Sequence, residues 1–194
     1  SLRESLLFPE WGAFLASCPP SPRLPEVKPT DGAQIQYTSG TTGFPKGALL
    51  HHRGLTNNGA HTAHRMGIRD GAVWITTMPL FHTGACVCCV LGAVSVRATQ
   101  VLVDAFEPGL VLELFDTYGG AAMVGVPTML VAMMEHASFA STDLSQVQGI
   151  CSGGSTVPAA LVRRFEDKMG ARGYCTAEGR LKDMIIRGGE NIYP

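Results

Sequence analysis

The sequence has no excess of charge of either sign. Its 194 residues include 15 lysines and arginines and 16 aspartates and glutamates, so the formal net charge at pH 7 is −1. No run of like charges is longer than a few residues, which argues against a charged tail of the kind that binds nucleic acid. We therefore expect no nucleic-acid partner.

Long apolar runs are also missing. The longest weakly polar stretch, Thr83–Val96, is too short for a membrane span and is rich in Gly, Ala and Cys. The first residues, Ser1–Ser5, contain neither a methionine start nor a basic and then apolar signal pattern. We expect no integral membrane segment, a cytoplasmic location, and a chain that begins inside a longer protein.

The cysteines and histidines do not form a complete metal-binding pattern. Three of the six cysteines lie within Cys86–Cys89, and the chain has no pair of C-x-x-C motifs of the kind that binds zinc. Metal or redox chemistry is the alternative there, but small buried thiols in a reducing cytosol are the simpler interpretation. The pairs His51 with His52 and His61 with His64 lack a further carboxylate or histidine to complete a set. The residues of any metal site therefore stay unknown.

The chain does contain a regular alternation of strand-like and helix-like segments. With 45% hydrophobic residues it can bury a sizeable core as one domain. Strands that alternate with helices predict an α/β fold, a mostly parallel sheet covered by helices on both faces. Ligands of such sheets bind outside the carboxyl ends of the strands. The expected strands are 33–37, 48–50, 73–78, 100–103, 121–126 and 147–151, and the expected helices are 11–16, 52–65, 83–94, 127–136, 158–169 and one that begins at Pro108. This last helix is expected to turn one face inward, formed by Leu110, Val111, Leu114, Phe115 and Tyr118.

The strongest single signal is Tyr37–Gly47, with the sequence YTSGTTGFPKG. Four hydroxylated residues and three glycines accompany Lys46, directly after a strand-like run. Glycines allow backbone N–H groups to turn toward a ligand, hydroxyls donate further hydrogen bonds, and the lysine adds a positive charge. This combination suits a polyphosphate.

This stretch is not a Walker A loop, because Pro45 precedes the lysine and Gly47 follows it. An apolar run comes next, so we expect the loop to join two strands and not to open a helix. The alternative is a hairpin loop rich in Gly, Ser and Thr with an incidental lysine.

Three further stretches combine glycines with polar groups. PLFHTGA at 79–85 contains His82, for which a hydrogen-bonded structural role is the alternative. SGGSTVP at 152–158 allows the backbone to lie flat against a ring or a phosphate, although a tight turn with a Ser155 or Thr156 helix cap also explains it. It does not match the nucleophile elbow G-x-S-x-G. For GRLKDMIIRGGENIYP at 179–194, the structural alternative is a β-hairpin with a basic rim.

In this order, the four stretches resemble motifs of the adenylate-forming superfamily, which comprises acyl-CoA synthetases, peptide-synthetase adenylation domains and luciferases. YTSGTTGFPKG resembles its phosphate loop, PLFH its acyl-pocket motif, and SGGSTVP the segment that packs against adenine. GRLKDMIIRGGENIYP resembles the motif at the hinge to a small C-terminal domain. The resemblance implies a fold that is part of the large N-terminal domain of such an enzyme.

The resemblance also implies roles for single residues. Lys46 and His82 are the expected catalytic residues, and His82 would border both the adenylate and the acyl group with no need to act as a base. Lys182 would be the hinge position, while Gly188 and Gly189 would face the pantetheine tunnel of CoA. The residues expected to bind ATP are Thr38, Ser39, Gly40, Thr41, Thr42, Gly43, Lys46, Gly153, Gly154, Ser155 and Arg180.

By the same resemblance, residues 1–32 are a peripheral linker, 33–172 bind ATP and the acyl group, and 173–194 end the large domain and lead to the hinge. Between Gly170 and Gly173 the family carries roughly a hundred further residues, the size of a substructure. These include Y-G-x-T-E, whose glutamate helps to hold Mg²⁺, and Y-x-T-G-D, whose aspartate binds the ribose; neither string occurs in this chain. Either the 194 residues belong to a longer polypeptide or they are an internally deleted derivative, and the intact flanking motifs favour the first.

The implied function is that of an ATP-dependent acyl-CoA synthetase for a fatty or similar aliphatic acid. The carboxylate would attack the α-phosphate of ATP to give acyl-adenylate and pyrophosphate, and the CoA thiol would then displace AMP. ATP, Mg²⁺ and CoA are the cofactors and co-substrates that this reaction needs. An aryl-CoA ligase, a peptide-synthetase adenylation domain and a non-catalytic nucleotide-binding fragment are the alternatives, although the ending GENIYP looks more like an acyl-CoA synthetase than an amino-acid adenylation domain.

Overall fold

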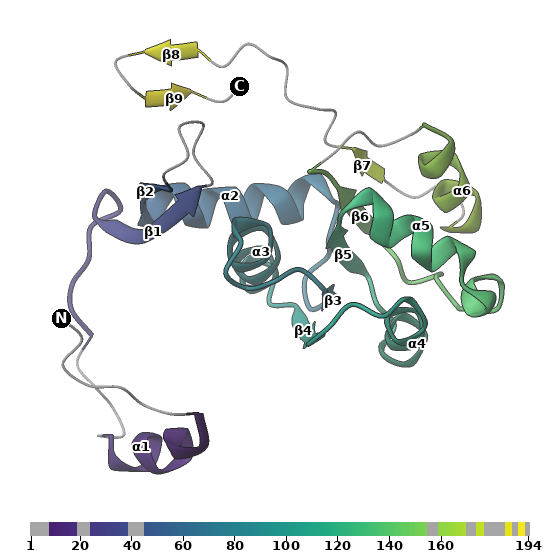
Figure 1. Cartoon of the computed structure of the whole chain (residues 1–194), viewed down its shortest axis with the longest axis horizontal. Coiled ribbons are helices and arrows are strands. Elements are labelled where there is room, and N and C mark those ends of the chain that lie inside the picture. Colours follow the sequence, from purple (N-terminus) through teal and green to yellow (C-terminus); the bar gives the residue numbers. More distant parts are fainter. Residues whose placement is uncertain are drawn as a thin grey trace.

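A parallel sheet lies at the centre of the computed structural model (Figure 1), which describes residues 8–18, 24–38, 45–154, 159–169, 174–176, 185–187 and 190–192. Its five strands follow the order β4-β3-β5-β6-β7, and each neighbouring pair is parallel. The α/β fold with a parallel sheet that the sequence predicts is thus confirmed. The strands are β3 (Val73–Thr76), β4 (Thr99–Leu102), β5 (Ala122–Gly125), β6 (Gly149–Ser152) and β7 (Tyr174–Thr176).

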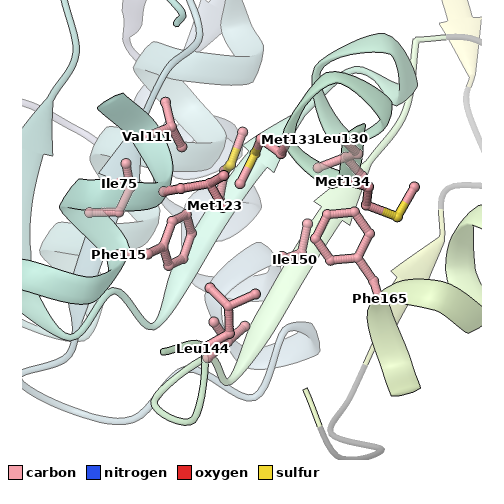
Figure 2. Close-up of a cluster of buried hydrophobic side chains, with 12 residues drawn as sticks. Ile75, Val111, Phe115, Met123, Leu130, Met133, Met134, Leu144, Ile150 and Phe165 are labelled. Atoms are coloured by element: carbon pink, nitrogen blue, oxygen red, sulfur yellow. The ribbon is translucent and has the colours of Figure 1, made fainter. Parts of the chain in front are cut away.

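Helices cover both faces of this sheet. Successive side chains of each strand point to opposite sides, so each strand packs against helices on both faces. Ile75 and Met123 belong to a cluster with residues of α4, α5 and α6, which Figure 2 shows. Their chain neighbours Trp74 and Ala122 belong to a second cluster with residues of α2, η2 and α3. The helices are α2 (His52–Arg65), η2 (Gly84–Leu91), α3 (Gly92–Ser95), α4 (Pro108–Tyr118), α5 (Pro127–Glu135) and α6 (Ala159–Met169).

Two of the predicted helices differ from the structure in detail. The apolar helix expected over 83–94 exists, but η2 is a π-helix that continues into the short α3. In α4, Leu110 is 41% and Tyr118 56% exposed, so both were wrongly placed on the inner face, whereas Leu112 is buried. Apolar residues occupy more than half of the circumference of α4, and packing against the sheet selects the face. The expected helix 52–65 has the predicted bounds, and its N-cap His51 accepts a 2.8 Å hydrogen bond at Nδ1 from the Gly54 N–H.

A separate antiparallel hairpin is formed by β1 (Gly32–Thr38) and β2 (Lys46–His51). In most such strands the apolar side chains face the protein and the polar ones face solvent. Here the polar side chains Gln34 and Gln36 are half-buried against the body of the protein. The outward face instead carries Ile35, Tyr37 and Leu49, which are 59%, 68% and 69% exposed. Polar contacts, described below, therefore connect this hairpin to the domain.

Five further short elements complete the described structure. They are η1 (Phe8–Glu10), α1 (Trp11–Ser17), η3 (Ala137–Ala140), β8 (Ile185–Arg187) and β9 (Glu190–Ile192), of which the last two pair as an antiparallel hairpin. Among the described residues, no helix has the length and apolar character that a membrane crossing requires.

Candidate active site

Three connecting segments meet at the carboxyl edge of the sheet. In the register of the strands, Thr76 lies opposite Val124 and Gly125 opposite Ser152, so the segments after β3, β5 and β6 leave the sheet together. Gly154 has φ of 84°, a left-handed conformation that favours glycine, and a Cβ at this position would lie 3.6 Å from Val126 Cγ1. The segment that contains Gly153 and Gly154 thus lies against the start of the loop after β5, where ligands of parallel sheets bind.

Ser152, the last residue of β6, was not singled out from the sequence. Its Oγ is buried and has no hydrogen-bond partner in the part of the chain that the structure describes. A buried hydroxyl without a partner is costly, so this atom is a polar group that a ligand or a neighbouring segment at the edge can satisfy. A serine that ends a buried strand directly before two glycines was the available signal.

His82 lies in the segment after β3, where the turn before η2 determines its orientation. Its Nδ1 accepts a 2.9 Å hydrogen bond from the Gly84 N–H, and its carbonyl accepts the N–H groups of Ala85 and Cys86 at 2.9 and 3.0 Å. Because Nδ1 is an acceptor, the neutral ring carries its proton on Nε2. The ring is exposed, so Nε2–H is available to an oxygen of a ligand. The structural role proposed as an alternative for His82 is therefore present, and it leaves the other nitrogen available.

Lys46 is the first residue of β2, and its Cα pairs with that of Thr38 across the hairpin. The loop therefore joins two antiparallel strands, as the sequence predicts. Lys46 is exposed, and it makes no ion pair with any described residue. An unpaired cation at the base of a loop rich in glycine and hydroxyl groups fits a polyphosphate, whose charge it would neutralise.

Two glutamines of β1 connect this hairpin to the segment that contains His82. Gln36 Nε2 donates to the carbonyl of Phe81 at 3.2 Å, and Gln34 Nε2 donates to Gln36 Oε1 at 2.9 Å and to Cys86 Sγ at 3.5 Å. The hairpin and the turn before η2, 45 residues apart in the chain, are thereby brought together. The sequence interpretation missed both glutamines. Their spacing, with Ile35 between them, shows that they share one side of the strand, but it does not show which partner they contact.

For Thr38 only the backbone is described. The expected site residues that lie outside the described residues are Ser39, Gly40, Thr41, Thr42, Gly43, Ser155, Arg180, Lys182, Gly188 and Gly189. Their roles stay predictions.

Among the described residues, no group of three or more His, Cys, Asp or Glu side chains could hold a metal ion. Mg²⁺ is usually bound by one or two carboxylates together with substrate phosphates, so its protein ligand stays unassigned. The thiols of η2 are not suited to metal binding either. Burial raises the pKa of Cys89 to about 12, and it also raises the pKa of Cys88. Thiols that stay protonated are poor metal ligands and poor nucleophiles, in agreement with small thiols of the core.

The comparison with known proteins identifies the family. The model of the AMP-binding enzyme family matches residues 3–179. The chain belongs to this family. Over 147 residues it is 36% identical to a feruloyl-CoA synthase from an Amycolatopsis species, covering 76% of this chain and 30% of the relative. It is 32% identical over 165 residues to the mitochondrial medium-chain acyl-CoA ligase ACSF2 of Macaca fascicularis, covering 80% of this chain and 26% of the relative.

Solved structures of the family share the fold. The N-terminal domain of FACL13 from Mycobacterium tuberculosis superimposes with a TM-score of 0.75 at 24% identity, over 89% of this chain and 42% of that domain. The described sheet and helices thus correspond to part of the N-terminal domain of an adenylate-forming enzyme. The chain spans less than a third of the length of the two CoA ligases above.

Proposed function

We propose that this chain contributes the phosphate-binding and acid-binding part of an ATP-dependent CoA ligase that acts on a fatty or similar aliphatic acid. In the first step the carboxylate oxygen attacks the α-phosphorus of ATP, and the bond to the pyrophosphate oxygen breaks. In the second step the CoA thiol attacks the acyl carbon, and AMP leaves. The observation that carries the proposal is the hydrogen bond from Gln36 to the Phe81 carbonyl. It joins the β1–β2 hairpin, which contains Lys46, to the turn that holds His82.

In this mechanism Lys46 and the loop before it neutralise the charge that develops on the leaving pyrophosphate. His82 Nε2–H donates to an oxygen near the junction of the carboxylate and the phosphate, and so orients the acid for attack. Gly153 and Gly154 expose backbone against the nucleotide base at the same edge. Mg²⁺, when bound, would share the phosphate charge. We assign to it no ligand among the described residues.

The aliphatic substrate is supported by η2, which begins two residues after His82 and carries no charged side chain. An apolar helix at this place suits contact with a hydrocarbon chain. The two relatives above are named for an aryl and for a medium-chain acid, so the family alone favours neither class. An aryl acid is therefore the second candidate. Cys18, Cys86, Cys88 and Cys89 form no disulfide, in keeping with a reducing compartment such as the cytoplasm.

The test is ATP–pyrophosphate exchange that depends on an added carboxylic acid. The protein is used at its natural length, which intact-mass measurement establishes, and the acids are acetate, octanoate, palmitate, benzoate and ferulate. We expect exchange to be fastest with octanoate or palmitate. Fastest exchange with benzoate or ferulate would replace the aliphatic acid by an aryl one. A native mass near 20.6 kDa together with no exchange for any acid would contradict the ligase proposal and leave a nucleotide-binding fragment.

A further inference from the structure

The side chains of β1 that face the protein body are amides, and they form a connected set of hydrogen bonds. Gln34 donates to Gln36 Oε1 at 2.9 Å, which leaves the Nε2 of Gln36 to donate to the Phe81 carbonyl at 3.2 Å. Gln34 also donates to Cys86 Sγ in η2. The orientation of the Gln36 amide is therefore determined from both ends.

The two ends of this contact adjoin the two halves of the proposed site. Gln36 is two residues before Thr38, whose Cα pairs with that of Lys46, and Phe81 immediately precedes His82. An isolated two-stranded hairpin is marginally stable, and the outward face of this one is exposed. One end of the hairpin is fixed by α2, into which β2 continues and whose His52 and Arg53 N–H groups donate to the carbonyls of Asp31 and Pro29. At the other end, nearer Thr38 and Lys46, the glutamine hydrogen bonds connect β1 to the His82 turn.

We infer that Gln36 is a positioning residue, which sets the distance between the phosphate-binding hairpin and the His82 turn through its amide bond to the Phe81 carbonyl. This inference rests on the proposed function. Adenylation requires a carboxylate held by one segment to meet a phosphate held by the other, and small misplacements of reacting groups reduce the rate strongly. Binding of each substrate alone needs only its own segment.

The test compares Gln36→Met with wild type in the acid-dependent exchange assay. Methionine keeps the length of the side chain and removes both hydrogen-bonding groups. We expect kcat to fall on the order of 10-fold because the two reacting groups are misaligned. The KM values for ATP and for the acid should stay within about twofold, because each binding segment is intact. Gln36→Glu, which keeps the acceptor for Gln34 but loses the N–H that reaches Phe81, should lower kcat at least as much. Gln146→Met makes the same change at an exposed glutamine on the loop before β6 and should leave kcat unchanged.

A second readout does not depend on activity. Amide hydrogen exchange in the protein at its natural length should accelerate in Gln36→Met for the peptide that contains His82, Gly84 and Cys86, and stay unchanged in α5. Wild-type kcat in an active Gln36→Met variant, or raised KM values at unchanged kcat, would overturn the inference while the proposed function stands. No exchange activity in wild type would instead overturn the proposed function. In that case unchanged protection around His82 would overturn the contact as well.

Discussion

At the scale of single residues, Lys46 has the most direct consequence for chemistry. It is an exposed cation at the base of the loop and has no ion-pair partner among the described residues. Lys46→Ala should therefore leave the fold intact and lower acid-dependent ATP–pyrophosphate exchange on the order of 10²-fold, as expected for one lost group that stabilises developing charge. The measurement is kcat of exchange, with far-UV circular dichroism to verify the fold.

Lys28→Ala is the matched control for this substitution. Lys28 is also exposed, and its backbone N–H donates to Asp31 Oδ2 in the segment before β1, at the opposite end of the hairpin from the phosphate loop. Its removal changes the net charge equally and should leave exchange within about twofold of wild type, as is usual for a surface substitution away from the site. Equal losses in the two variants would mean that overall charge and not the loop position of Lys46 matters.

At the scale of elements, α2 packs against the junction of η2 and α3 with almost no space between the backbones. A Cβ at Gly59 would lie 2.7 Å from Leu91 Cβ, 2.8 Å from the Leu91 carbonyl carbon and 2.9 Å from the Gly92 nitrogen. Alanine favours an isolated helix by about 0.8–1.0 kcal/mol over glycine, but overpacking against backbone costs about 1–3 kcal/mol. Gly59→Ala should thus destabilise the protein by about 1 kcal/mol in urea unfolding, the difference between the middle values of these two effects.

Gly12→Ala is the control, because nothing lies within 4 Å of a Cβ at this position of α1. It should leave the midpoint of unfolding unchanged or raise it slightly. A neutral Gly59→Ala would show that α2 can move away from η2 at little cost.

The beginning of α4 should make the stability of the protein depend on pH. The backbone N–H groups of Gly109 and Leu110 donate to the Glu107 carboxylate and lower its pKa below the ordinary value of 4.5. A carboxyl whose pKa is lowered by folding stabilises the folded state above its unfolded pKa, and this contribution is lost as the pH falls through the folded value. The difference in urea midpoint between wild type and Glu107→Gln should therefore be constant near neutral pH and shrink below about pH 4.5.

Glu113→Gln, which makes the same charge change at an exposed position of α4, serves as the control for Glu107→Gln. A difference for Glu107→Gln that persists unchanged at pH 3 would mean that the cap does not depend on the charge of the carboxylate.

The same elements show what could be predicted from the sequence. The bounds of α2 were predicted from the local sequence, but its N-cap, His51, was not. The inner face of α4 was partly wrong because Leu110 and Leu112 are equally apolar, and only the position of the sheet decides which is buried. The π-helical form of η2 was not predicted, since periodicity over eight residues does not distinguish helix types.

For the whole molecule, the family and the order of the motifs could be predicted, but the contacts between motifs could not. Lys46 and His82 were singled out because each lies in a distinctive string of residues. Gln36 lies between apolar residues in an ordinary strand, and its role follows only from the Phe81 carbonyl, a group 45 residues away whose position depends on the sheet. Long-range hydrogen bonds between a side chain and the backbone leave no periodic signal.

The two hydrophobic clusters share one sheet, so we expect them to unfold together. Met123, buried in the cluster of Figure 2, is the neighbour of Ala122 in the opposite cluster, where Trp74 is also buried. Met123→Ala removes about 2–5 kcal/mol from one face. In a Trp11→Phe background, in which Trp74 is the single tryptophan, its fluorescence reports on the other face. Fluorescence and far-UV circular dichroism should then show the same lowered urea midpoint, because the sheet cannot stay intact on one face alone.

Leu102→Ala, at an exposed position of the edge strand β4, is the control for Met123→Ala and should change stability by less than about 0.5 kcal/mol. If the fluorescence midpoint of Met123→Ala stayed at the wild-type value while the circular dichroism midpoint fell, the two faces would be independent. The proposed site requires the segments after β5 and β6, which contain Val126 and Gly154, to lie side by side. They do so only while β5 and β6 remain paired. Coincident transitions would instead mean that the core on both faces stabilises the site at the edge.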